Sequence, residues 1–394
     1  MAKVFIEEST LSAIGNAIRE KEGSTELVPV PEMSTRILAI ESGGGGELPE
    51  EAFVITGDCN YRLSNNGWNW FLDLYSNRIS TTAITSLINT FAGSFRLEQI
   101  PFTVNVVNCE NFSRAFQDCL GLEKSPKVRG TLSAKAAFED FITRCQRLRN
   151  VDDLLTQDML VDMQNYKVTT AYTCPRPVKF SSCYSLRTIP SWWYMFKLNP
   201  ESTVYPSASY GIYNNTFYDC YTLDEALDIP VWSCKGAQTS NMFSSFASGC
   251  HRLKKLTFET DNGQPIVTQW KSQTLDLSSK VGYVDTSTIN KALQYNSGIT
   301  ADKEVKDDAT YQALKNDPDW TTRKIEYSRY NHDSAVETIN SLPDTSAYLA
   351  SASGTNTIKF KKTSGSKTDG GAIENLTAEE IAVAAAKGWT VTLA

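Results

Sequence analysis

A pattern of three hydrophobic positions repeats along the middle of the chain. Phenylalanine, cysteine and leucine recur at three-residue intervals, and several copies continue into Ile-Pro. Looser copies carry one more residue between Phe and Cys, and one has serine in place of cysteine. Six residues occupy the cysteine position: Ser94, Cys119, Cys145, Cys183, Cys220 and Cys250. The first two spacings between these positions match the length of a leucine-rich repeat, and the later, longer ones indicate loops inserted into the repeat.

Each copy predicts a short local structure. Residues three apart share one face of a helical turn, so the Phe-to-Cys segment is expected to be helical. The Leu-x-x-Ile step is expected to enter a short strand that ends at proline, which lacks a backbone donor. One unit cannot bury its own apolar face, so neighbouring units should stack. We therefore expect Cys119, Cys145, Cys183, Cys220 and Cys250 to be buried and reduced.

The N-terminal residues predict a separate helical hairpin. Thr10 is a suitable cap for a first helix, and Gly23 is suited to follow its end. Pro31 can open a second amphipathic helix. Gly43–Gly46 then forms a linker by its composition. The apolar positions expected to face a docking partner are Leu11, Ile14, Ile18, Met33, Ile37 and Ile40, because a hairpin this small cannot hold a good core alone.

Beyond residue 280 the repeat pattern stops. Residues 286–295 and 301–315 predict two short helices. Residues 357–360 predict a strand, 376–387 a helix capped by Thr377, and 390–393 a final strand. This strand-helix-strand unit should cover the last exposed edge of the stack.

These motifs resemble two known groups of proteins. The Phe-x-x-Cys-x-x-Leu-x-x-Ile-Pro skeleton of residues 51–280 resembles BspA-like leucine-rich repeats, found on bacterial surface proteins and in phage-encoded proteins. Residues 55–71 are similar to a lead-in unit of the phage-borne versions, and residues 8–21 with Pro31-Glu32-Met33 resemble a leader shared by phage virion proteins. The last residues are similar to the C-terminal cap of BspA-like arrays.

The resemblance implies an α+β fold, an irregular leucine-rich-repeat solenoid with a small N-terminal helical hairpin and a strand-helix-strand cap. The expected segments are a docking module (1–42), a glycine-rich linker (43–50), the solenoid (51–280), a helical insertion (281–335) and a capping repeat (336–394).

The resemblance also implies a structural protein of a bacteriophage virion. The favoured role is a tail-associated protein that binds the host surface, either a glycan or a protein. The alternative is a head or baseplate decoration protein with a purely structural role. The resemblance implies docking to other virion proteins through residues 1–42, and a homo-oligomer, for example a trimer. A carbohydrate-active enzyme is a third and weaker interpretation.

Charge and hydropathy exclude several partners. The formal net charge is −7, which disfavours binding to nucleic-acid phosphates. No apolar run approaches the length of a membrane span. The first residues turn acidic before an apolar stretch forms, so we expect no signal peptide and assembly of the virion protein in the host cytoplasm. Residues 1–42 carry four basic and seven acidic side chains, unlike helices that bind membrane surfaces.

Candidate chemistry is sparse. The nine cysteines form no Cys-x-x-Cys pair, and the two histidines, His251 and His332, are too few for a typical metal site. Cys250 and His251 are adjacent, but adjacent side chains seldom point the same way. Gly43–Gly46 lacks the Lys-Ser/Thr of a phosphate loop. We therefore expect no enzyme activity, no metal and no cofactor.

Aromatic residues cluster between Cys145 and Cys220. On exposed loops they would stack on sugars or anchor a protein partner. Burial inside a wide array is the competing interpretation and the more usual fate of large aromatic side chains. The predicted partner-binding residues are Trp192, Trp193, Tyr194, Tyr210 and Tyr213.

Overall fold

The chain divides into two compact units, Met1–Ala52 and Phe53–Ala394. The computed structural model describes residues 12, 15–19, 25, 29, 53–58, 67–168, 177–197, 199, 201–202, 212–278, 330–362 and 371–394. In the first unit, residues 15–19 are helical, within the first predicted helix. Ile18 is buried, so its side chain serves the packing of the chain itself rather than an exposed docking face. The other predicted docking residues lie outside the described residues: Leu11, Ile14, Met33, Ile37 and Ile40.

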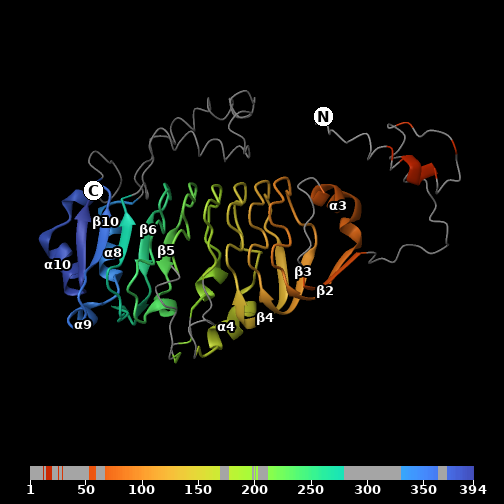
Figure 1. Cartoon of the computed structure of the whole chain (residues 1–394). Helices are drawn as coiled ribbons and strands as arrows, with labels where there is room; N and C mark the ends of the chain where they lie inside the picture. Colours follow the sequence, from red (N-terminus) through yellow and green to blue (C-terminus); the bar gives the residue numbers. More distant parts are fainter. Residues whose placement is uncertain are drawn as a thin grey trace, which may run out of the picture. The chain divides into compact units, whose positions relative to one another are not determined.

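The second unit is mixed α and β, with few helices and small, mostly parallel sheets (Figure 1). One sheet has the order β1-β2-β3-β4, another has the order β11-β10-β9, and β5 pairs with β6. The parallel strands are β1 (Phe53–Asp58), β2 (Ile79–Ser86), β3 (Thr103–Asn111), β4 (Lys127–Ala137), β5 (Ala226–Ile229), β6 (Lys255–Phe258), β9 (Thr274–Leu277), β10 (Asn356–Phe360) and β11 (Trp389–Leu393). An antiparallel hairpin joins β7 (Thr260–Asp261) to β8 (Gln264–Pro265).

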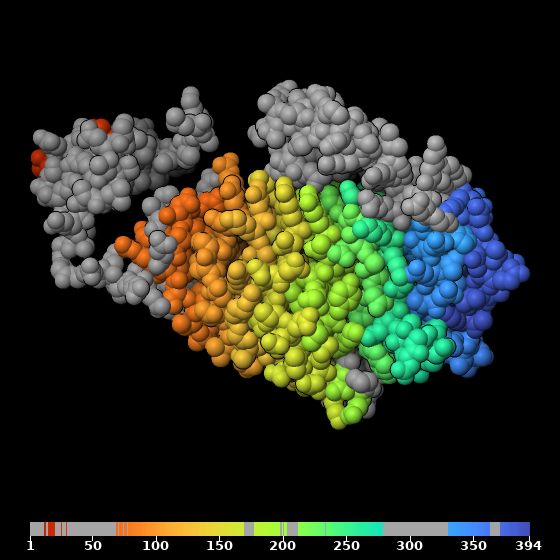
Figure 2. All heavy atoms as spheres, turned by 180° about the vertical axis from the view of Figure 1, so that it is seen from behind, coloured from red at the N-terminus to blue at the C-terminus, as the bar shows by residue number. Residues whose placement is uncertain are grey.

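Short helices lie between the strands and at the C-terminal end. The α-helices are α3 (Gly67–Tyr75), α4 (Gln157–Asn165), α8 (His332–Ser341), α9 (Ser346–Leu349) and α10 (Ala378–Ala386). The 3₁₀ helices are η1 (Ser76–Arg78), η3 (Ser191–Met195), η5 (Val231–Cys234) and η6 (Ile373–Asn375). In Figure 2 the colours of the second unit follow one another in sequence order, so each segment lies against its neighbours in the sequence.

The repeated motif forms a series of tight turns, which we number 1 to 6 by the residue at the cysteine position. These residues are Ser94, Cys119, Cys145, Cys183, Cys220 and Cys250. The prediction of a helical turn is wrong. The residue just before this position has a positive, left-handed φ in every turn, for example at Asp118 and Arg144, which a right-handed helix excludes. The backbone instead closes successive four-residue turns, as in the bond from Leu122 N to Cys119 O at 3.1 Å.

The strand predicted before proline forms in turn 5 and not in turn 1. β5 ends at Ile229, directly before Pro230. In contrast, Leu97–Ile100 is not a strand, and β3 begins only after Pro101. In turn 1 the strand is therefore formed by residues that follow the proline, not by those before it.

The five cysteines form a ladder of hydrogen bonds along the stack. Each thiol donates a hydrogen bond of 3.0–3.2 Å to a backbone oxygen of the preceding turn. The acceptor residue stands three positions before the cysteine position of that turn. The pairs are Cys119 with Phe91, Cys145 with Phe116, Cys183 with Ile142, Cys220 with Phe180, and Cys250 with Phe217. All five cysteines are fully buried and free, which confirms the predicted burial. The small thiol lets each turn approach the one before it.

The C-terminal strand-helix-strand unit is confirmed, with ends shifted by one or two residues. β10, α10 and β11 replace the predicted ranges 357–360, 376–387 and 390–393. Thr377 caps α10 in a capping box with Glu380, as the sequence indicates. β10 also pairs in parallel with β9, so the C-terminal unit continues a sheet begun before residue 280.

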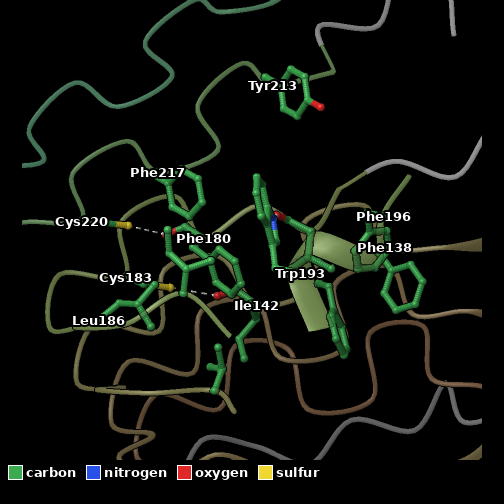
Figure 3. Close-up of a cluster of buried hydrophobic side chains, with 14 of the residues drawn as sticks. Phe138, Ile142, Phe180, Cys183, Leu186, Trp193, Phe196, Tyr213, Phe217 and Cys220 are labelled. Atoms are coloured by element: carbon green, nitrogen blue, oxygen red, sulfur yellow. Dashed lines mark hydrogen bonds between the residues drawn. The ribbon is translucent and has the colours of Figure 1, made fainter. Parts of the chain in front are cut away.

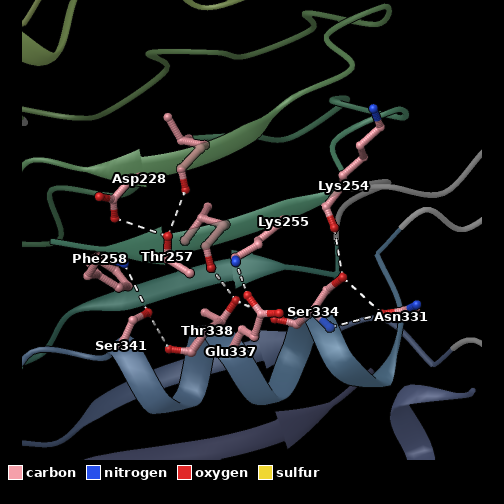
Figure 4. A network of polar contacts seen from close by, with 12 residues as sticks. Asp228, Lys254, Lys255, Thr257, Phe258, Asn331, Ser334, Glu337, Thr338 and Ser341 are labelled. Carbon is pink, nitrogen blue, oxygen red and sulfur yellow. Dashed lines mark hydrogen bonds and ion pairs between the residues drawn. The ribbon is translucent and has the colours of Figure 1, made fainter. Parts of the chain in front are cut away.

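Helix α8 covers the outer edge of β6 (Figure 4). The hydroxyls of Ser334 and Thr338 donate to the backbone oxygens of Lys254 and Leu256, while the backbone N–H of Phe258 donates to the Ser341 hydroxyl. Three hydroxyls spaced four and three residues apart thus replace the backbone of a next strand. The boundary predicted between residues 335 and 336 falls inside α8 and needs correction. The helices predicted at 286–295 and 301–315 lie outside the described residues.

Candidate functional site

Trp192 and Trp193 belong to the core, which corrects their prediction as surface anchors. Both lie in η3, at 1% and 0% exposure. The indole N–H of Trp192 donates to Val151 O at 2.9 Å, and that of Trp193 donates to Val178 O at 2.9 Å. Figure 3 shows Trp193 between the phenylalanines of neighbouring segments. Trp192 packs against Phe180 and Phe196, and Trp193 packs against Phe217.

Of the predicted tyrosines, Tyr213 is also part of the core. Tyr213 is fully buried, and its hydroxyl donates to Pro230 O at 2.5 Å. Tyr194 is half-buried, and burial raises the pKa of its phenol to about 12. Tyr210 lies outside the described residues. The sequence correctly located an aromatic cluster, but Trp192, Trp193 and Tyr213 are buried in the protein.

A polar groove of about 500 Å³ crosses the outer side of turns 2 to 6. Its lining comes from the residues one to five positions before the cysteine position. They are Gln117 of turn 2, Asp140, Thr143 and Arg144 of turn 3, Lys179, Ser181 and Ser182 of turn 4, Asn215 and Tyr218 of turn 5, and Ser245 of turn 6. This volume lies within the usual range of ligand pockets.

The groove spans the junction between turns 3 and 4, where the turns share the fewest backbone bonds on this side. Four backbone bonds connect turn 2 to turn 3 on this side, from the N–H groups of alternate residues between Phe112 and Asp118. Among the described residues, a single bond of this row joins turn 3 to turn 4, from Arg144 N to Ser181 O at 2.8 Å. Two such bonds join turn 4 to turn 5, and three join turn 5 to turn 6. Fewer backbone bonds therefore hold turns 3 and 4 together on this side.

Charged side chains of both signs lie at the groove. Arg144 makes a bidentate ion pair with Asp118 of the preceding turn, at 2.5 and 2.6 Å, and this pair raises the arginine pKa. Lys179 donates to the side-chain oxygen of Asn214 at 2.5 Å. Asp140 adds a carboxylate on the turn 3 side. Two cations thus face two carboxylates, and the Asp219 carboxylate lies near Tyr218, so the groove has no excess of positive charge.

Tyr218 is the exposed aromatic residue of the groove, with 36% of its surface accessible. The nearby charge of Asp219 raises the pKa of its phenol, which keeps the hydroxyl protonated. Its backbone oxygen accepts from Ser182 N at 2.7 Å, so turn 4 holds it in place. The sequence contains the signal that locates Tyr218, because it stands two residues before Cys220, the position that Gln117 occupies in turn 2.

The remaining candidate chemistry is structural. His251 is buried, and its ring stacks on Tyr221 with centroids 5.4 Å apart. His332 lies 3.2 Å from a Glu380 oxygen, where it links α8 to the start of α10. Within the described ranges, no three His, Cys, Asp or Glu residues gather in a way that could hold a metal ion. No helix in these ranges is long and apolar enough to cross a membrane.

We compared the chain with known protein families, curated proteins and solved structures. No protein family model, curated protein or solved structure matches this chain.

Proposed function

We propose that the second unit is an irregular leucine-rich-repeat solenoid of the BspA-like type. Six turns in one register, a ladder of buried thiols between them and a strand-helix-strand unit at the end support this proposal. The two longest spacings, from Cys145 to Cys183 and from Cys183 to Cys220, then reflect inserted segments that contain α4 and η3.

We further propose that the protein is a structural component of a phage virion that binds the host surface. The first unit docks to other virion proteins, and the second unit presents its outer surface to the host. The observation that carries the binding role is the polar groove of about 500 Å³ across turns 2 to 6. A purely decorative stack would not need such a hollow, since the junction between turns 1 and 2, outside the groove, is joined by four backbone bonds.

The docking half of this proposal is tested by deleting residues 1–42 and following the protein into purified particles. The second unit should remain folded, because it forms a compact unit by itself. Loss of the protein from the particles with an unchanged melting temperature is the expected result. Truncated protein that still enters particles would move docking to the second unit.

The binding half is tested with purified full-length protein as a competitor of particle adsorption to host cells. Wild-type protein should slow adsorption, and the double variant Lys179→Ala, Asn215→Ala should compete poorly. Val107→Ala is the matched control, since Val107 is 52% exposed on β3 and lies outside the groove. Absence of competition by the wild type would favour a purely structural role.

A further inference from the structure

We propose that the groove binds a neutral, hydroxyl-rich oligosaccharide laid across turns 2 to 6, with one sugar ring stacked on Tyr218. This inference rests on the proposed function, in which the second unit binds the host surface, and it names the class of ligand. It is carried by four observations: the length of the groove, its hydrogen-bonding groups, its balance of charge and its exposed aromatic ring.

The shape of the groove suits a chain rather than a compact molecule. Its lining extends from Gln117 of turn 2 to Ser245 of turn 6, so it crosses four junctions between turns. Backbone segments joined by hydrogen bonds are about 4.8 Å apart, so the groove is on the order of 19 Å long. A linear oligosaccharide of several units fits this length, whereas a single monosaccharide would contact only two or three turns.

The lining offers both donors and acceptors along this length. Ser181, Ser182 and Ser245 present hydroxyls, and Gln117 and Asn215 present amides. Hydroxyls and amides each donate and accept hydrogen bonds, as sugar hydroxyls do. The buried Thr143 hydroxyl donates to Asp140 O at 3.3 Å and contributes to the floor.

The balance of charge favours a neutral ligand. Arg144 is compensated by Asp118 through two short bonds, and Asp140 offsets the charge of Lys179. A polyanion would gain little from a groove without net positive charge, because affinity for such chains depends on uncompensated Lys and Arg. The same four groups still form directed hydrogen bonds with neutral hydroxyls.

Tyr218 supplies the stacking surface. An exposed aromatic ring next to polar groups contacts the apolar C–H face of a sugar while the neighbouring groups bind its hydroxyls. The Tyr218 backbone accepts a hydrogen bond from Ser182 N, so only the side chain of this residue has to become ordered on binding. Trp192 and Trp193 cannot serve this purpose, since both are buried.

The test measures binding of full-length protein to linear neutral hexasaccharides of glucose, galactose and N-acetylglucosamine by isothermal titration calorimetry. At least one hexasaccharide should bind, equally well at low and high salt. Tyr218→Ala should weaken this binding about tenfold. Tyr218→Phe retains the ring and should bind within about threefold of the wild type. Val107→Ala is the matched control and should leave affinity unchanged.

The outcomes separate this inference from the proposed function. Binding of sulfated or carboxylated hexasaccharides in preference to all neutral ones would overturn the assignment of ligand class. If the Tyr218→Ala variant still competes with particles for adsorption to host cells, the groove is not the binding site, although the protein binds the host. Failure of every neutral hexasaccharide to bind would overturn the inference, whatever the adsorption assay gives. Binding of a neutral hexasaccharide without any effect on adsorption would support the groove and reject the host-binding role.

Discussion

Raising the pH should destabilise the second unit through its buried thiols. Burial raises the pKa of Cys183 to about 12 from an ordinary value of 9.0, and it raises the pKa values of Cys145, Cys220 and Cys250 in the same direction. In the unfolded chain these thiols ionise near pH 9, whereas in the folded chain they remain protonated. The stability they contribute is therefore complete below pH 9 and is lost as the pH rises toward the folded pKa values.

The magnitude follows from this difference. At pH 10, a thiol that ionises only in the unfolded chain lowers the free energy of unfolding by about 1.4 kcal/mol. The four thiols together should lower it by about 5 kcal/mol between pH 8 and pH 10. Lys387 acts in the opposite direction, because burial lowers its pKa to about 8 and favours the folded state above that pH. Its effect is reduced by solvent, since the lysine is only half-buried.

The assay is urea unfolding followed by circular dichroism at several pH values under reducing conditions. Cys183→Ser is the informative variant, because the serine hydroxyl does not ionise between pH 8 and pH 10. Serine also fits this position, since Ser94 occupies it in turn 1. The variant should lose about a quarter of the pH dependence, and the contribution of Lys387 cancels in the comparison. An unchanged pH dependence, or rapid labelling of all the thiols in the native protein at neutral pH, would refute the thiol ladder.

Three further predictions concern the packing of the second unit and are tested by urea denaturation. Gly249→Ala should lower the free energy of unfolding by about 2–3 kcal/mol, because φ is left-handed at Gly249 and the new Cβ would lie 2.5 Å from a carboxylate oxygen of Asp219. Gly263→Ala is the control and should lower it by about 1 kcal/mol, because Gly263 has a similar φ but open space around it. Thr338→Val should lower the free energy of unfolding by about 1–3 kcal/mol, because it leaves Leu256 O without its hydroxyl donor. Thr338→Ser keeps a hydroxyl and should lose much less stability, and equal losses in the two variants would contradict the role of the hydroxyl. Trp192→Ala should cost about 3–5 kcal/mol, and a fully stable variant would contradict the core placement.

The sequence predicted the register of the stack because burial depends on local spacing. Cysteines three residues from phenylalanine and leucine are buried at the expected positions. The backbone of the turns was not predictable in the same way, since Arg144 and Ser182 adopt left-handed φ values that their residue types do not favour. Gly93 and Gly249 mark this conformation clearly in the sequence, and Asp118 and Asp219 mark it more weakly.

The candidate site was less predictable than the fold. Whether an aromatic side chain points inward depends on the loop around it, and the loops near Trp192 have no repeating register. Tyr218 does have a register position, so comparison of the turns would have located it. The edge of β6 shows a further limit, because Thr338 satisfies Leu256 O across 82 residues of sequence. Nothing in the local pattern of either segment indicates that partner.

The most direct test of the groove is a crystal structure of the full-length protein with the tightest-binding neutral hexasaccharide. We expect the sugar chain to cross turns 2 to 6, with one ring on the Tyr218 side chain and hydroxyls bonded to Asp140 and Asn215. A sugar bound elsewhere on the protein, or a groove filled by other parts of the chain, would contradict this account.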